Sequence, residues 1–475
     1  MSTTRIRYSD CLPPAWRTVA ETTAVYARDT GLSERHLQCI WSDDKLRPAG
    51  LTDVRGETIE VITPGRWNLE AGPDFLDAVL LAGPEKRRLA GDVEIHIHPA
   101  AWKQHHHGGD PNYDRVIAHV TYAPGPSADD GLPAHVLRLS LRDRLRLNPG
   151  FSFDDIDLVA YPHAVIPATP RPCALALGPD PDRWTALLDS AGLHRLACKQ
   201  ARMLAQIAQT RDPRQSFYEA FLAALGYKLN TQAFRRLAQL LPLADWPREA
   251  PPMLHYARLL RAAGLLPDPA KGRDAASRTL IRQLWDLAWR HPAPDPDPPL
   301  RWRMGAMRPA NHPTRRLAVA AAVFGSTAAI DTLWVDIPFD PPDRWFKTVI
   351  RRLAQRATPE FWGDRETLTQ STCGTRPTAL LGATTAATIV TNVIVPFLAG
   401  TRDDMDGLLR ALPAEAIDAP MRATAAHLFG RDHNPAVYAS HGLRQQGLLQ
   451  IFNDFCLNAH AGCANCGLAE SLHTS

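Results

Sequence analysis

The stretch Pro64–His98 reads PGRWNLEAGPDFLDAVLLAGPEKRRLAGDVEIHIH, and it predicts two neighbouring β-strands that carry polar groups at one end. In the second segment, Gly91–His98, apolar and polar residues alternate. Successive side chains of a strand point to opposite faces, so one face is apolar and can lie on a core. The opposite face carries two carboxylates and two imidazoles, from Asp92, Glu94, His96 and His98.

A second apolar strand is predicted at Phe75–Ala82, directly after Gly-Pro-Asp. The link Gly83–Gly91 is polar and bounded by glycines, which is typical of a hairpin-like return. Pairing of the two strands would bring Asp74 close to Glu94 and His96. Paired carboxylates suit a hard divalent cation such as Mg²⁺ or Mn²⁺. The alternative is an amphipathic strand whose polar face is solvated.

Length and composition indicate a soluble globular protein of two or three domains. The chain has 475 residues, 45% of them hydrophobic and 22% charged, and a net charge of +3. This charge excludes a chain that is polybasic overall, so any nucleic-acid surface would be local. Residues Met1–Asp10 contain no apolar signal-peptide segment, and the uncharged stretch Pro377–Thr401 is rich in threonine. We therefore expect a cytoplasmic protein with a buried helix at Pro377–Thr401 and no membrane span.

The predicted fold is α+β or α/β: a small mixed sheet flanked by helices, followed by a larger, mostly α-helical region. A short helix is expected at Glu34–Trp41, opened by Ser33, and further strands at Thr58–Thr63, Arg115–Tyr122 and His135–Leu141. The predicted division of the chain is an α/β domain at 1–150, a Pro/Asp-rich boundary at 151–182, a helical domain at 183–290, a linker at 291–300, a second helical region at 301–455 and a cysteine-bearing tail at 456–475.

Further histidines follow the second strand. Within Trp102–Tyr113, His105, His107 and Asp110 are placed to reach a metal or a phosphate from a loop, although three consecutive histidines are usually solvated. His119 lies inside a predicted strand, where it is either a core residue or a side chain aimed at the same site. Asn68 and His98 complete the set of possible site residues.

The stretch Arg301–Leu317 is strongly basic and contains one tryptophan. Arginine binds two phosphate oxygens at once, and an indole ring can stack on a base. The candidate nucleic-acid contacts are Arg308, Arg315, Arg316 and Trp302. The alternative is a loop held by pairs between arginine and carboxylate groups.

The chain ends with cysteines spaced for metal binding. Cys456, Cys463 and Cys466 form a C-x6-C-x2-C pattern, which favours zinc or an iron–sulfur cluster. A fourth ligand is needed, and the open candidates are His460, His473, Cys11, Cys39 and Cys373. Free structural thiols are the alternative.

These blocks resemble a known bacterial family, domain-of-unknown-function family 2851, over nearly the whole chain. The resemblance rests on P-G-x-x-N-x-x-x-G-P-D-F, G-D-V-E-I-H, W-x-x-H-x-H-x-x-D-x-x-Y-x-x-V-I-x-H-V, R-P-x-N-x-P-x-R-R and the terminal cysteines. Membership implies no known activity.

A second resemblance is to the PD-(D/E)XK nuclease superfamily. It rests on G-P-D before one strand and E-x-H on the next, so Asp74 and Glu94 match its acidic positions. The resemblance implies that Glu34 is the acidic residue of the preceding helix and that His96 replaces the superfamily's lysine. Some nucleases of that superfamily hold an iron–sulfur cluster with C-terminal cysteines, similar to the tail here.

Three hypotheses follow for the function. In the first, a Mg²⁺- or Mn²⁺-dependent nuclease-like enzyme uses Asp74 and Glu94 to hold the metal and His96 to orient a water, with nucleic acid as its partner. In the second, a catalytically inactive protein of the same fold binds nucleic acid or protein and keeps a structural metal in its tail. In the third, a metallohydrolase of a small molecule uses His96, His98, His105 and His107.

Overall fold

The computed structural model forms two compact parts, which we call the sheet unit and the helical unit. The sheet unit contains Met1–Ala191, Ile417–Pro435 and Gly447–Ser475, and the helical unit contains Gly192–Ala416 and Ala436–Gln446. The residues that the structure describes are 7–12, 32–68, 72–125, 131–148, 151, 153, 156, 158, 171–247, 250–297, 299–302, 304, 311–325, 330–357, 362, 365, 367–370, 379–402, 405–430, 432–456, 463 and 466–474.

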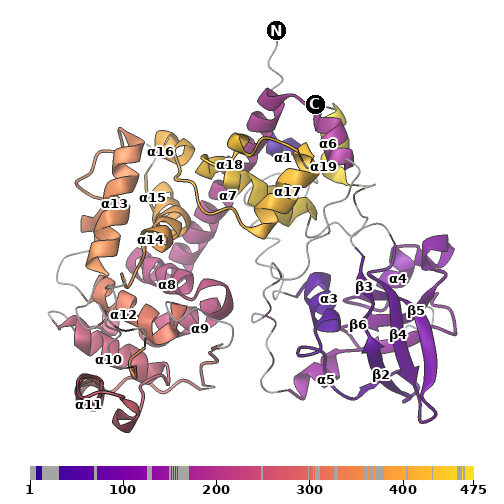
Figure 1. The fold of residues 1–475 in the computed structure, drawn as a ribbon, viewed down its shortest axis with the longest axis horizontal. Coiled ribbons are helices and arrows are strands. Elements are labelled where there is room, and N and C mark those ends of the chain that lie inside the picture. Colours follow the sequence, from indigo (N-terminus) through magenta and orange to yellow (C-terminus); the bar gives the residue numbers. More distant parts are fainter. Residues whose placement is uncertain are drawn as a thin grey trace. The chain divides into compact units, whose positions relative to one another are not determined.

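One mixed sheet organises the sheet unit (Figure 1). Its strands are β1 (Leu51–Thr52), β2 (Thr58–Thr63), β3 (Arg66–Trp67), β4 (Phe75–Ala82), β5 (Arg87–His96), β6 (Val116–Thr121) and β7 (Leu137–Ser140). The spatial order is β1-β2-β4-β5-β6-β7, and β3 also pairs with β4. Pairs up to β5 are antiparallel, whereas β5, β6 and β7 run parallel. The predicted hairpin of β4 and β5 is therefore present at the centre of the sheet.

Two local features fix the position of β5. The chain turns tightly after β4, where the Lys86 amide donates to the Gly83 carbonyl at 3.1 Å, so β5 begins earlier than the sequence pattern predicts. On its other side, β6 approaches Gly91 so closely that a Cβ atom there would lie 2.4 Å from the Arg115 carbonyl oxygen. A side chain at this position would push the two strands apart, so the close parallel pairing needs glycine.

Helix α3 (Glu34–Ser42), which the sequence predicted at Glu34–Trp41, packs on the apolar face of the sheet. Ser33 is its N-cap, in a capping box with His36. The buried side chains of the helix, including Leu37, Ile40 and Trp41, share a core with Phe75, Leu80, Val93 and Ile95. This core places the first turn of α3 near the end of β5.

The opposite face of β5 is buried too, and in this the structure differs from a solvated polar face. Helix α4 (Ala101–Gln104) and the turns at His107–Gly109 and Pro111–Tyr113 follow β5. Trp102 of α4 packs with Val116, Leu132 and Val136 in a small separate cluster. As a result, every residue from Gly91 to His96 is buried, including the polar ones.

Short helices from distant parts of the sequence complete the sheet unit. They are α1 (Tyr8–Cys11), α5 (Arg142–Arg146), α6 (Pro172–Leu177), α17 (Ala419–Phe429) and α19 (Gly467–Thr474). The longer helices α7 (Pro181–Thr210) and α18 (Gly442–Ile451) each contribute residues to both units. The C-terminal segment is thus part of the sheet unit, and 456–475 is not a separate tail as the sequence predicted.

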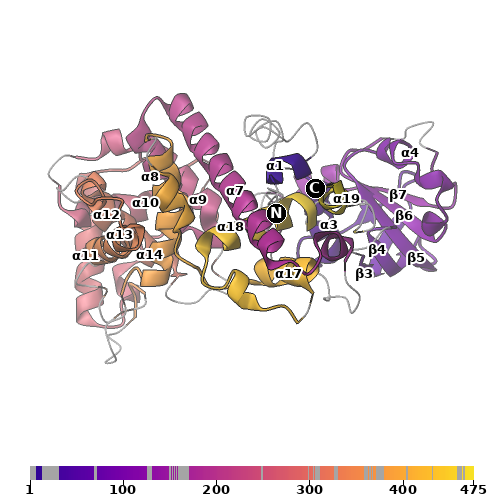
Figure 2. The ribbon, with the colours of Figure 1, turned by 90° about the horizontal axis from the view of Figure 1, so that it is seen from above.

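The helices of the helical unit gather in one group (Figure 2) and share one hydrophobic core. Its further helices are α8 (Pro213–Leu225), α9 (Tyr227–Leu240), α10 (Pro252–Ala262), α11 (Ala275–Arg290), α12 (Pro313–Phe324), α13 (Pro342–Arg356), α14 (Ala383–Ile389), α15 (Val395–Ala399) and α16 (Asp406–Arg410). Leu284 and Leu317, on either side of the predicted linker 291–300, belong to this same core. The predicted division into two helical regions at 291–300 is therefore replaced by one continuous unit.

The uncharged stretch near residue 390 is an interior helix, as expected. Helices α14 and α15 are joined by a π-helical turn at Val390–Ile394, and Val390, Val393, Ile394 and Val395 are buried in the core. Among the described residues, no helix combines the length and the apolar character needed to cross a membrane.

Candidate metal-binding site

The centre of the site is a contact between Asp74 and Glu94, which the antiparallel pairing of β4 with β5 brings together. Phe75 lies opposite Val93, so the residue before β4 reaches Glu94. The Asp74 backbone amide donates to Glu94 Oε2 at 3.1 Å. The Asp74 carboxylate accepts from the Ile95 amide at 2.8 Å and from Gln38 Nε2 at 2.6 Å. These bonds hold Asp74 in place, while further lone pairs of its oxygens remain able to bind a cation.

Three imidazoles meet beside Glu94. His96 Nε2 lies 3.1 Å from His105 Nδ1 and 3.4 Å from His107 Nε2. Glu94 Oε1 lies 3.3 Å from both His96 Nε2 and His107 Nε2. Each of the three histidines offers one nitrogen, and these nitrogens lie within 4.8 Å of one another. The arrangement offers three nitrogen donors and one carboxylate oxygen to a single ion.

His119 orients His96 from below the cluster. His119 Nε2 lies 2.8 Å from His96 Nδ1, so the bonded nitrogen of His96 is the one that faces away from His105 and His107. The parallel register of β5 and β6 causes this contact, because Glu94 lies opposite His119. A second partner on the other ring nitrogen is what fixes a metal-binding histidine.

Glu34 approaches the same place from the first turn of α3. Its carboxylate accepts from the Ile97 backbone amide, and it interacts electrostatically with His105 and His107. Burial raises the pKa of Glu34, and these three partners oppose the rise. Glu34 is therefore a carboxyl group whose proton affinity is tuned by its surroundings.

Without a bound metal ion, the charged forms of the site's carboxylates and of the His107 imidazole are unfavourable. Burial raises the pKa of Asp74 well above its ordinary value, and the negative charges of Glu94 and Glu34 raise it further. Burial also raises the pKa of Glu94, which is only 6% exposed, against the hydrogen bond from the Asp74 amide. Burial lowers the pKa of His107, with Asp110 and Glu34 opposing. Neutral imidazoles beside carboxylates are the protonation state that a metal ion requires.

The site opens to solvent at one side. His96 is 1% exposed, His107 is half-buried and His105 is exposed. Tyr113 covers part of the opening, with its ring stacked on His107 at a centroid distance of 3.9 Å. The cluster therefore reaches the protein surface at His105.

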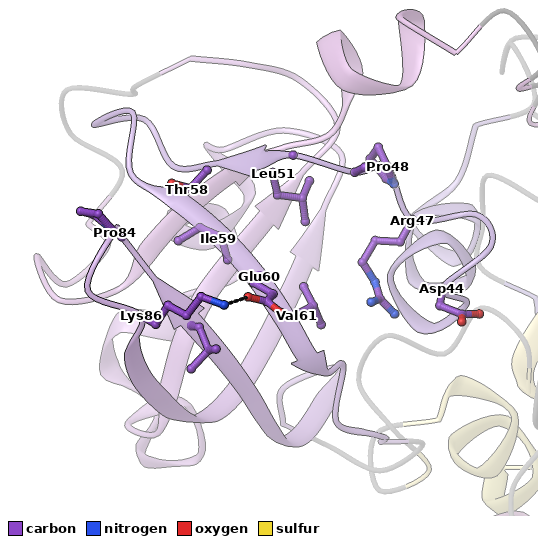
Figure 3. A pocket seen from close by; sticks show the side chains of 14 residues that line it. Asp44, Arg47, Pro48, Leu51, Thr58, Ile59, Glu60, Val61, Pro84 and Lys86 are labelled. Atoms are coloured by element: carbon purple, nitrogen blue, oxygen red, sulfur yellow. Dashed lines mark hydrogen bonds and ion pairs between the residues drawn. The ribbon is translucent and has the colours of Figure 1, made fainter.

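A pocket of about 600 Å³ elsewhere in the sheet unit does not contain this chemistry (Figure 3). It is lined by residues of β1, β2, the turn after β4 and the segment between α3 and β1, which contributes Arg47, and Lys86 pairs there with Glu60 at 3.3 Å. None of the site's carboxylates or imidazoles lines it.

The remaining predicted site residues have supporting or peripheral positions. The side-chain Nδ2 of Asn68 donates to the Pro73 carbonyl at 2.8 Å, and the backbone amide of Asn68 donates to the Asp74 carbonyl at 2.7 Å. Asn68 therefore shapes the loop before Asp74. Asp110 accepts from the Asn112 amide at 2.9 Å and caps the turn that carries Tyr113. His98 is exposed and lies outside the group of three histidines.

Of the described arginines in 301–317, Arg315 and Arg316 have interior positions, whereas Arg301 is exposed. Arg315 is 1% exposed and donates to the carbonyls of Arg365 and Ala379. Arg316 is 6% exposed and donates to Asn311 Oδ1 at 2.5 Å. These guanidinium groups are buried, so they are not available to a phosphate backbone, and the prediction for them is corrected accordingly.

The indole of Trp302 is also engaged within the helical unit. Its Nε1 donates to the Ala263 carbonyl at 2.7 Å, and its ring meets the edge of Phe234. Stacking on a base would require breaking both contacts. Arg308 lies outside the described residues.

Two residues of the site were missed by sequence reasoning. Gln38 holds Asp74, and it lies one helical turn after Glu34 on α3, a spacing that places both on one helix face. Tyr113 was part of the quoted motif but was given no role. The fixed spacing of Glu34 and Gln38 is the signal that would have identified Gln38.

A family model, described as "Protein of unknown function (DUF2851)", matches residues 34–407. The chain belongs to the DUF2851 family. The matched range begins at Glu34 and includes Asp74, Glu94 and all the histidines of the site. No curated protein and no solved structure matches this DUF2851 chain.

Proposed function

We propose that the protein is a metal-dependent hydrolase of phosphodiester bonds, similar in its acidic residues to PD-(D/E)XK nucleases. One observation carries the proposal: the carboxylates of Asp74, Glu94 and Glu34 and the imidazoles of His96, His105 and His107 gather at the end of one strand. The acidic residues come from the start of β4, the end of β5 and the preceding helix, which are the elements that the resemblance implied.

The donor set fits a transition metal ion. Glu94 and the three histidines would hold it, with Asp74 beside them. Imidazole nitrogen suits transition metals and carboxylate oxygen suits Mg²⁺ and Mn²⁺, so of the two predicted ions Mn²⁺ fits the mixed set better. When bound, such an ion lowers the pKa of a coordinated water and offsets phosphate charge.

The protein's own residues have distinct tasks in this proposal. Glu34, with its raised pKa and its position at the histidines, is suited to accept a proton from the attacking water. His119 and Gln38 position His96 and Asp74 through the hydrogen bonds described above. Exposed His105 marks the side from which the phosphate enters. His96, held on both sides, binds the metal instead of supplying the fixed charge of a lysine.

The direct test is a cleavage assay with the full chain. Labelled single- and double-stranded DNA and RNA are incubated with Mn²⁺, Mg²⁺, Zn²⁺ or a chelator, using wild-type protein, Asp74→Asn and Glu94→Gln. We expect Mn²⁺-dependent cleavage that both variants lose. The matched control is Asp77→Asn, an exposed aspartate of β4 that pairs with Arg66 and Arg115 at the surface. Wild-type protein that binds no metal and cleaves no nucleic acid would rule the proposal out.

A second function is favoured by the histidine cluster itself. Three nitrogens within 4.8 Å are a donor set that also serves hydrolysis of small esters or amides. A panel of chromogenic phosphodiesters, carboxylic esters and amides separates the two functions. Turnover of an ester or amide with zinc, and none of any phosphodiester, would select the small-molecule hydrolase. Nucleic-acid binding without turnover of any substrate would select the inactive protein.

A further inference from the structure

The C-terminal cysteines lie in two adjoining pieces of the sheet unit. Cys456 ends the π-helical turn Phe452–Cys456 that follows α18. The Cys466 amide donates to the Cys463 carbonyl at 3.4 Å, so this pair forms a tight turn immediately before α19. The spacing of these two cysteines is that of C-x2-C metal sites.

A fourth cysteine comes from a distant part of the sequence. Cys173 is the second residue of α6, which packs against both α19 and α17 (Figure 1). Its Sγ lies 3.5 Å from the carbonyl oxygen of His427 on α17. Cys456 Sγ lies 3.9 Å from Nδ1 of the same His427. The sulfur atoms of Cys173 and Cys456 therefore both lie next to His427.

The packing of α6 on α19 brings Cys173 close to the turn of Cys463 and Cys466, which lies directly before α19. The four thiols also interact electrostatically. Burial raises the pKa of Cys173 to about 12, and the charges of Cys466 and Cys463 add to the rise. Burial likewise raises the pKa of Cys456, and the charges of Cys173, Cys463 and Cys466 add to that rise.

We propose that Cys173, Cys456, Cys463 and Cys466 together bind one metal centre through four thiolates. Cys173 is the missing fourth ligand of the C-terminal pattern. None of the candidates considered from sequence is needed: Cys39 is buried in the core of α3 and the sheet, and Cys11 lies on α1 with its Sγ near the Arg7 carbonyl. His460 and Cys373 lie outside the described residues.

The centre would join segments that are far apart in sequence. Its ligands come from α6, from the turn after α18 and from the start of α19. The same region holds α1, because Tyr8 Oη donates to Asp454 Oδ2 at 2.8 Å. The metal would thereby fasten both ends of the chain to the sheet unit, independently of the proposed hydrolase site.

The test is metal analysis of the full chain purified without oxygen. We expect one centre per chain, and Cys173→Ser should lose it as completely as Cys466→Ser does. Iron with acid-labile sulfide and visible absorption identifies a cluster, and colourless protein with zinc identifies a single ion; both support the four-thiolate centre. The matched control is Cys198→Ser on α7, a buried cysteine that also contacts a histidine, His194, and should keep the metal.

A second measurement uses the wild-type protein and so does not depend on folding of the variants. Thiol alkylation is mapped by mass spectrometry before and after a chelator. Cys173, Cys456, Cys463 and Cys466 should become reactive together when the metal leaves. Metal-free wild-type protein, or full metal content in Cys173→Ser, would overturn the proposal.

Discussion

The end of β5 and the start of α12 both bury charged side chains, but they compensate the charges in different ways. At β5, the carboxylates of Asp74 and Glu94 lie together. Burial raises the pKa values of both, the negative charge of Glu34 raises both further, and the charge of Glu94 also raises the pKa of Asp74. At α12, buried Arg315 donates to backbone carbonyls and lies over the ring of Trp362. The first region gathers like charges, and the second satisfies each charge within the protein.

The arginine region also contains a complete ion pair. Arg365, whose carbonyl accepts from Arg315, pairs through its own guanidinium with Asp274 at 2.9 Å. Asp274 caps α11 by accepting from the Ser277 amide at 2.7 Å. Every charge here has a protein partner, so the region is explained by stability alone. At the end of β5, Asp74 and Glu94 are held by backbone amides, by Gln38 and by imidazoles, and Asp74 also interacts electrostatically with Arg35. Because three carboxylates still gather there, we place the chemistry at this end of the strand.

The largest effect is expected for Glu94→Gln. Loss of a direct carboxylate ligand should weaken Mn²⁺ binding on the order of 100-fold or more and abolish turnover. Because burial of the charged form is unfavourable, the metal-free variant should be no less stable than the wild type. Calorimetric titration with Mn²⁺ and thermal unfolding in chelator test the two parts. Unchanged Mn²⁺ affinity would contradict the assignment of Glu94 as a metal ligand.

Arg315→Leu should have the opposite pattern. It leaves two buried carbonyl groups without their donor, which we expect to cost about 2–4 kcal/mol of unfolding free energy. Metal binding at β5 should not change. The control is Arg301→Leu, an exposed arginine of the same stretch, whose unfolding free energy should stay near that of the wild type. Denaturant unfolding measures both, and a strong loss of nucleic-acid binding in Arg315→Leu with unchanged stability would contradict this assignment.

His119→Phe tests whether the hydrogen bond between His119 and His96 contributes to metal affinity. Removing the bond to His96 Nδ1 should reduce metal affinity by about 10- to 100-fold, as loss of an outer hydrogen-bond partner does. His119→Gln keeps a hydrogen-bonding group and should recover part of the affinity. If both variants lose the same affinity, packing of residue 119 matters and its hydrogen bond does not.

The smallest effect is expected from the pH dependence of Asp274. The hydrogen bond from Arg365 lowers the pKa of Asp274 in the folded protein, and the Ser277 amide adds to it. A lowered folded-state pKa contributes stability above the unfolded value of about 4, and this contribution is lost as pH falls through the folded-state pKa. Asp274→Asn should flatten the acid side of the stability profile of the helical unit. An unchanged profile would remove Asp274 from this account.

Sequence reasoning located the elements of the sheet well because their periodicity is local. Strands β2 and β4 begin and end at the predicted residues, and the helix opened by Ser33 is present. The contact of Asp74 with Glu94 followed from strand pairing alone. The division of the helical region could not be predicted, because the hydrophobic pattern of each helix does not tell which helices share a core.

The arginine stretch shows where composition misleads. The motifs R-W-R and R-R do not distinguish guanidinium groups that bind a phosphate from guanidinium groups that donate to a buried carbonyl. Arg315 and Arg316 face inward because α12 is buried on all sides, and every residue of that helix from Pro313 to Val323 is buried. Burial of a whole helix depends on its neighbours and leaves no local mark on the charged residues.

The sequence by itself determined the paired strands, the acidic residues at the start of β4 and the end of β5, and the cysteine spacing of the C-terminus, because each depends on residues close together in the chain. Only the tertiary structure decided that His105 and His107 fold back onto His96 and that Cys173 joins the C-terminal thiols. Those contacts are fixed by packing of α4 and of α6 against distant elements. The free energy of that packing comes from the core as a whole, which no short stretch of sequence encodes.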